Sequence, residues 1–122
     1  MPDARSGYSP DLLRGNTDAL LLSLIDELGS TYGYQIIKEI EKRSRGFFRF
    51  KEGTIYPALR KLENDGLVQG KWQETPSGQA RRYYQITAKG KEMLRKKIAT
   101  WQSFTTAVNL IFRPSDVAGV VD

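Results

Sequence analysis

Basic and aromatic side chains gather in the middle of the sequence, where their types suit contact with a polyanion. Residues 53–100 hold ten Lys and Arg against four Asp and Glu, whereas residues 1–52 hold eight of each kind. An excess of positive charge that is confined to one segment predicts a basic face, and a basic face attracts nucleic acid. A solvated Lys/Arg surface without a partner would give the same counts.

Catalytic chemistry has few candidate residues in this chain. The sequence contains no His and no Cys, which excludes the commonest general base and all thiolate chemistry. No pair of carboxylates flanks a glycine-rich or cleft-forming segment, so Asp and Glu offer no evident acid–base site. We therefore expect no enzyme activity, no metal site and no cofactor.

The chain of 122 residues, 39% of them hydrophobic, has room for one domain with a modest core. No stretch approaches the roughly 20 apolar residues of a membrane helix. The first residues also lack the apolar run of a signal peptide. We expect a soluble, cytoplasmic protein.

Two helices are predicted in the first third of the chain. The first begins at the polar residues 16–18, carries leucines at helical spacing and ends at Gly29. The second has Ser30 or Thr31 as its N-cap and three isoleucines along one stripe. The segment RGFFRFKEG, residues 45–53, then predicts a short extended piece that closes over the core.

The stretch GTIYPALRKLENDGLV predicts a third helix. Ile55, Leu59 and Leu62 lie at i, i+4 and i+7, so one stripe faces the core. With Thr54 as N-cap, Pro57 falls in the first turn, where backbone N–H groups have no partner within the helix. The proline therefore marks the start of the helix.

A β-hairpin and a long helix complete the chain. LVQGKWQE and ARRYYQIT read as two strands joined through TPSGQ. The closing helix opens at Thr87 and carries a heptad-like apolar seam, namely Leu94, Ile98, Trp101, Val108 and Phe112. A domain this small has little core left to cover the end of that seam, so we expect a homodimer.

Helix, helix, helix, hairpin and helix is the order of a winged helix-turn-helix, mostly α with a β-hairpin wing. In this architecture the third helix enters the major groove of double-stranded DNA and the hairpin follows the phosphate backbone. We expect a DNA-binding domain over residues 1–87, a dimerisation helix over 88–112 and a flexible tail over 113–122. The candidate DNA-binding residues are Thr54, Tyr56, Arg60, Lys61, Lys71, Arg81 and Arg82.

Each of these residues also has a simpler interpretation. Tyr56 could be a half-buried aromatic at the rim of the core, and Arg60 and Lys61 could be solvated helix surface. Arg81 and Arg82 are adjacent in a strand, so their side chains point to opposite faces and at most one of them should reach DNA. The prediction depends on the order of the elements and on the charge that two of them carry.

The segments LLSLIDELGSTYGYQIIKEI, GTIYPALRKLENDGLV and RRYYQITAKGKEML resemble the PadR family of bacterial transcriptional regulators. The resemblance runs roughly from Leu13 to Leu94. It implies a winged-helix repressor that binds a palindromic promoter as a dimer, often near its own gene. The single closing helix is similar to the short, LmrR-like branch, in which a tryptophan of each subunit flanks a flat drug molecule. The matching residue here is Trp101.

The resemblance implies a multidrug-binding site for a planar aromatic ligand at the dimer interface. Its candidate residues are Trp101, Ile98, Phe104 and Leu12. The closing helix has no acid from Met93 to Asn109, so it lacks the group that a cationic drug would favour, although Asp11 or Asp18 of the N-terminal segment could approach the site. Two alternatives stay open: Trp101 could be a plain interface anchor, and the fold could contact RNA or protein without any small-molecule effector.

Overall fold

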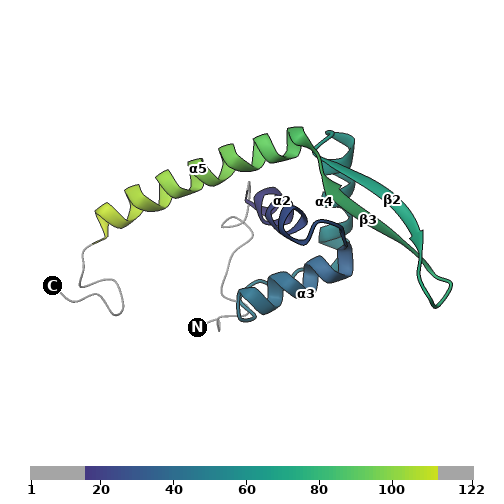
Figure 1. The fold of residues 1–122 in the computed structure, drawn as a ribbon. Coiled ribbons are helices and arrows are strands. Elements are labelled where there is room, and N and C mark those ends of the chain that lie inside the picture. The colour runs from purple at the N-terminus through teal and green to yellow at the C-terminus, as the bar shows by residue number, and fades with distance from the viewer. Residues whose placement is uncertain (1–15, 113–122) are drawn as a thin grey trace.

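The computed structural model describes residues 16–112, which form four helices and a three-stranded antiparallel sheet (Figure 1). The elements follow in the order α2 (Thr17–Leu28), β1 (Thr31–Tyr32), α3 (Gly33–Arg43), α4 (Glu52–Asn64), β2 (Val68–Glu74), β3 (Ala80–Ile86) and α5 (Ala88–Ile111). This order confirms the predicted winged helix-turn-helix with a long closing helix. No helix of the described residues is long and apolar enough to cross a membrane.

Helices α2, α3 and α4 pack around one apolar core with the start of the hairpin and of α5. α2 begins after Asn16 and ends at Gly29, as predicted, and the φ of 82° at Gly29 is one that glycine adopts without strain. The fully buried side chains of the core come from all three helices: Leu21, Leu22, Ile25, Ile36, Ile55, Leu59 and Leu62. The apolar stripe predicted for α4 is therefore its core face.

The start of α3 differs from the prediction. Thr31 does not cap the helix, because Thr31 and Tyr32 form the short strand β1 and pair with β3. The Thr31 hydroxyl instead donates to Oε1 of Gln35 at 2.6 Å. α3 starts at Gly33, where a Cβ would lie 2.2 Å from the Tyr56 ring, so the close packing of α3 on α4 requires glycine.

α4 begins three residues earlier than predicted. Its N-cap is Lys51, whose carbonyl accepts from the N–H groups of Thr54 and Ile55 at 2.9 and 3.1 Å. Thr54 is therefore inside the first turn, and Pro57 lies in the second turn rather than the first. A proline there removes the N–H that would otherwise bond the carbonyl four residues earlier. The sequence prediction of Thr54 as N-cap was wrong.

The segment between α3 and α4 turns back over the core without pairing in the sheet. Phe48 and Phe50 are half-buried and pack against the core, as expected for a segment that closes over it. Their rings stack with centroids 6.4 Å apart, and the Phe47 ring meets Phe48 edge-on at 4.9 Å.

The wing, which we define as β2, β3 and the tip at residues 75–79, has a regular register from Val68↔Ile86 to Glu74↔Ala80. At the tip, the backbone N–H and the hydroxyl of Thr75 both donate to the Gln79 carbonyl, at 2.9 and 2.8 Å. β3 lies between β2 and β1. The two strands of the hairpin were predicted, whereas β1 was not.

α5 opens at Thr87, as predicted. The Thr87 hydroxyl accepts from the Gly90 N–H at 3.0 Å and donates to the Gly66 carbonyl at 2.7 Å, which fixes the helix to the turn before β2. Leu94 is buried in the core. Beyond it, α5 passes over α2 and continues away from the hairpin (Figure 1).

Candidate nucleic-acid interface

A groove of about 750 Å³ separates the outer side of α4 from the wing. We call it the α4–wing groove. Its lining is aromatic and charged and comes from α4, the wing, β1 and the start of α3: Tyr32, Gly33, Tyr34, Glu52, Tyr56, Arg60, Glu63, Asn64, Trp72, Gln79, Ala80, Arg81, Arg82 and Tyr84. Four of the seven predicted DNA-binding residues therefore share one surface, namely Tyr56, Arg60, Arg81 and Arg82.

Tyr56 is half-buried, with its ring packed against Gly33. Burial raises the pKa of Tyr56 above its ordinary value, and the charge of Glu52 raises it further. The hydroxyl is therefore protonated near neutral pH and can donate a hydrogen bond to an anionic oxygen. The ring fits the rim-aromatic interpretation, while the residue still lines the groove.

Arg60 and Lys61 lie on different sides of α4. Arg60 is exposed and lines the α4–wing groove. Lys61 lies outside that lining and donates to Oδ2 of Asp65 at 3.0 Å. This hydrogen bond raises the pKa of Lys61 above its ordinary value. Thr54 is exposed and also lies outside the lining, so the four candidate residues of α4 do not form one face.

Arg81 and Arg82 both line the α4–wing groove, although their side chains have different partners. The exposed Arg81 guanidinium stacks over the Tyr32 ring, 4.5 Å from its centroid. Arg82 instead forms an ion pair with Glu63 of α4. The hydrogen bond with Glu63 raises the pKa of Arg82 above its ordinary value. Lys71 is exposed and pairs in register with Tyr83.

Sequence reasoning missed the acidic and aromatic members of this groove. Glu63 was not among the candidates, and no local pattern points to it because its partner Arg82 is 19 residues away in sequence. Tyr32 reaches Arg81 because β1 pairs with β3, which two residues of sequence did not reveal. Helical spacing could have identified Asn64, because it lies one turn after Arg60 and on the same side of α4.

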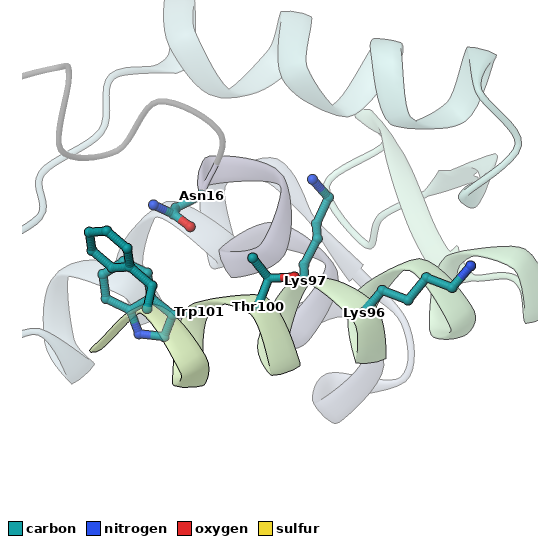
Figure 2. Close-up of a pocket in the computed structure, with 6 residues that line it drawn as sticks. Asn16, Lys96, Lys97, Thr100 and Trp101 are labelled. Atoms are coloured by element: carbon teal, nitrogen blue, oxygen red, sulfur yellow. The ribbon is translucent and has the colours of Figure 1, made fainter. Parts of the chain in front are cut away.

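A second candidate site lies where α5 passes α2. An apolar groove of about 400 Å³, which we call the α2–α5 groove, is lined by Asn16, Ala19, Leu20, Ser23, Phe47, Phe48, Lys97, Ile98 and Trp101. The adjoining surface includes Lys96, Thr100 and Phe104, and Figure 2 shows Lys97 and Trp101 with Asn16 across from them. Trp101 and Phe104 stack with ring centroids 5.8 Å apart. The structure thus brings Trp101, Ile98 and Phe104 together, and Leu12 lies outside the described residues.

Residues 16–112 contain no group of three or more His, Cys, Asp or Glu side chains that could hold a metal ion. The lining of the α4–wing groove combines hydrogen-bond donors, cations and aromatic rings with the carboxylates of Glu52 and Glu63. The donors, cations and rings suit contact with a phosphate backbone and base edges.

Comparison with known proteins agrees with the geometry. The Transcriptional regulator PadR-like family matches residues 21–96. An uncharacterised protein of Lysinibacillus sphaericus is 33% identical over 100 residues, which span 82% of this chain and 91% of that protein. The structure of a transcriptional regulator from Clostridium thermocellum superposes with a TM-score of 0.78 at 31% identity, covering 87% of this chain and 99% of that one. A PadR family regulator from Eggerthella lenta gives 0.72 at 31% identity, covering 83% and 85%.

Proposed function

Because the chain belongs to the PadR-like family of DNA-binding transcriptional regulators, we propose that it is a cytoplasmic repressor that binds a palindromic operator as a homodimer. We further propose that a planar aromatic molecule releases it from DNA. The assignment of residues 1–87 to DNA binding and 88–112 to dimerisation belongs to this proposal, while the tail expected at residues 113–122 lies outside the described residues.

The single observation that carries the proposal is the α4–wing groove. α4 presents Arg60 and Asn64 on the side that faces away from the core, and Arg81 lies across the groove on the wing. When a helix of this fold enters the major groove, one phosphate strand passes between the helix and the wing. Arg60 then reaches a base edge or a phosphate, while the Tyr56 hydroxyl and Arg81 contact the strand between them.

The exposed apolar surface of α5 supports the homodimer. Large apolar side chains are exposed from the contact of α5 with α2 to the C-cap of the helix: Ile98, Trp101, Phe104, Leu110, Ile111 and Phe112. Leu110 and Ile111 are 81% and 79% exposed. A contiguous apolar surface of this kind marks an interaction site. A second copy of α5 that packs across the first would cover it and would place two copies of α4 side by side.

The α2–α5 groove supports the effector site. Its lining is largely apolar, and Trp101 and Ile98 are still partly exposed at 46% and 39%. An indole face beside an apolar groove suits a flat aromatic ligand through offset stacking and burial of apolar area. Two ways of packing α5 on its partner would place the two α4 helices at different spacings. A ligand that binds one packing more tightly would favour that spacing. The affinity for DNA would then change by the ratio of the ligand's affinities for the two packings.

The proposal is tested by footprinting the purified protein on the DNA upstream of its own gene, followed by transcription in vitro from the protected promoter. We expect protection of a palindrome and fewer transcripts as protein is added. An RNA of the same sequence serves as competitor. If RNA displaces the duplex at equal concentration, or if transcripts rise with protein, the repressor proposal is wrong.

A further inference from the structure

One ion pair joins the last turn of α4 to the middle of β3. Arg82 Nε donates to Oε1 of Glu63 at 3.3 Å, and Arg82 Nη2 donates to Oε2 of the same carboxylate. Two parallel hydrogen bonds of this kind fix the direction of the contact as well as its length. α4 and the wing are therefore connected by side chains in a defined orientation.

The pair is well shielded compared with the other ion pairs in residues 16–112. The side chains of Arg82 and Glu63 are 27% and 26% exposed, and in each other pair of this range at least one partner is 42% exposed or more. Exposed pairs contribute little, whereas breaking a shielded pair leaves a poorly solvated charge. Within the described residues, this is also the only ion pair that links α4 to the wing.

Two residues of β2, Gly70 and Trp72, lie against this ion pair. A Cβ at Gly70 would lie 2.8 Å from both Arg82 Nε and Glu63 Oε1, so glycine leaves the space that the pair occupies. Trp72, which pairs in register with Arg82, places its ring 5.4 Å from the guanidinium carbon. Residues of α4 and β2 thus hold the Arg82 guanidinium between the wing and α4.

We propose that Glu63 and Arg82 are positioning residues that hold the wing at the angle to α4 at which both contact DNA, and that Arg82 does not bind phosphate. The inference depends on the proposed DNA-binding mode. The Arg82 charge is already matched by Glu63, so a phosphate contact would require breaking a shielded pair. A wing that is already held in place loses less conformational freedom on binding, which increases affinity.

The two possible roles of Arg82 predict opposite effects of Glu63→Gln. If Arg82 bound phosphate, Glu63 would compete with the DNA, and its neutralisation would tighten binding. If the pair positions the wing, the same change loosens the wing and weakens binding. Removing a phosphate contact also lowers the slope of log affinity against log salt by about one per contact, whereas loosening the wing leaves the slope unchanged.

The first experiment measures operator affinity as a function of salt for Glu63→Gln, Arg82→Gln and the double variant. We expect each to weaken binding about tenfold with the wild-type salt slope, because a charge-assisted hydrogen-bond pair is lost. The double variant should lose no more than either single one. Gly70→Ala, which expels the pair sterically, should weaken binding as well. Urea unfolding of each variant shows that it is folded at the assay temperature.

Two controls match these variants. Asp65→Asn removes the same charge from the same end of α4, but Asp65 pairs with Lys61 and not with the wing, so binding should stay equal or become tighter. Arg81→Gln changes the neighbouring arginine, which stacks on Tyr32 of β1 and forms no ion pair with Glu63, and it should lower the salt slope by about one per subunit. A tighter Glu63→Gln complex together with a lower salt slope for Arg82→Gln would overturn the proposal.

A second experiment needs no DNA. In a Trp101→Phe background, Trp72 is the remaining tryptophan of the chain, so its nanosecond anisotropy decay reports motion of the wing. Glu63→Gln should add a fast component that Asp65→Asn does not. An unchanged decay would show that the pair does not hold the wing. If the wild-type protein bound no duplex at all, the proposed function would fail, while this measurement would still decide whether the pair holds the wing.

Discussion

Arg60 and Lys61 are neighbours in the sequence, yet their surroundings on α4 differ. Arg60 lines the α4–wing groove, whereas Lys61 lies outside that lining and is paired with Asp65. The side chains of Lys61 and Asp65 are 71% and 48% exposed, so their ion pair contributes little to stability. A DNA phosphate can therefore replace Asp65 as the partner of Lys61. The two cations should therefore contribute differently to DNA recognition.

Arg60→Ala should weaken operator binding by about 1–3 kcal/mol and relax preference at one position of each half-site, because Arg60 is placed to reach a base edge. Lys61→Ala should weaken all duplexes about equally and lower the salt slope by about one per subunit. Fluorescence anisotropy with operator variants measures both effects. Should the double variant bind the operator as well as wild type, α4 is not the element that reads DNA.

Gly33 and Gly53 provide a second residue-scale comparison. A Cβ at Gly33 would overlap the Tyr56 ring, whereas a Cβ at Gly53 would meet nothing within 4 Å. Gly33→Ala should lower the free energy of unfolding by about 1–3 kcal/mol through overpacking. Gly53→Ala, inside α4, should raise it by about 0.5–1 kcal/mol. Urea denaturation compares the two, and equal destabilisation would contradict the close packing of α3 on α4.

The elements follow from the sequence where the pattern is local. The leucine spacing and Gly29 located α2, the alternation on either side of residues 75–79 located the hairpin, and Thr87 located the start of α5. β1 escaped prediction because two residues carry no periodicity, and only pairing with β3 makes them a strand. The start of α4 was misplaced because Pro57, which favours a first turn, is tolerated in the second.

The candidate site was predictable only in part for the same reason. Helical spacing and charge suggested Tyr56 and Arg60, and both residues line the α4–wing groove together with Arg81 and Arg82. Which of the two arginines is paired could not be predicted, because the partner of Arg82 lies on another element. Contacts between elements depend on how α4 and the wing pack, and no local pattern encodes them.

α5 allows a test of the effector at the scale of the element. Trp101 lies beside the α2–α5 groove, while Trp72 lies on the wing. Planar aromatic compounds should quench the fluorescence of wild type and of Trp72→Phe, but have much less effect on Trp101→Phe. The same compounds should release DNA from wild type. If Trp101→Phe binds and responds equally well, Trp101 is only an interface anchor.

The whole molecule should be a dimer through α5. Leu94 is buried in the core, whereas most large apolar residues after Lys97 are exposed. A chain truncated after Lys97 should keep its core and sediment as a monomer at concentrations where the full chain is a dimer. A truncated chain that dimerises as tightly as the full one would place the interface elsewhere.

In the proposed complex, two copies of α4 read two half-sites of one DNA duplex. Hydroxyl-radical footprinting of the wild-type protein on its operator tests this most directly, with Arg60→Ala beside it. We predict two protected regions related by two-fold symmetry, with half-site centres about 10 base pairs apart or a multiple of that, and loss of both regions together in Arg60→Ala. A single unsymmetrical region, or a pattern that Arg60→Ala leaves unchanged, would show that two copies of α4 do not read the operator in this way.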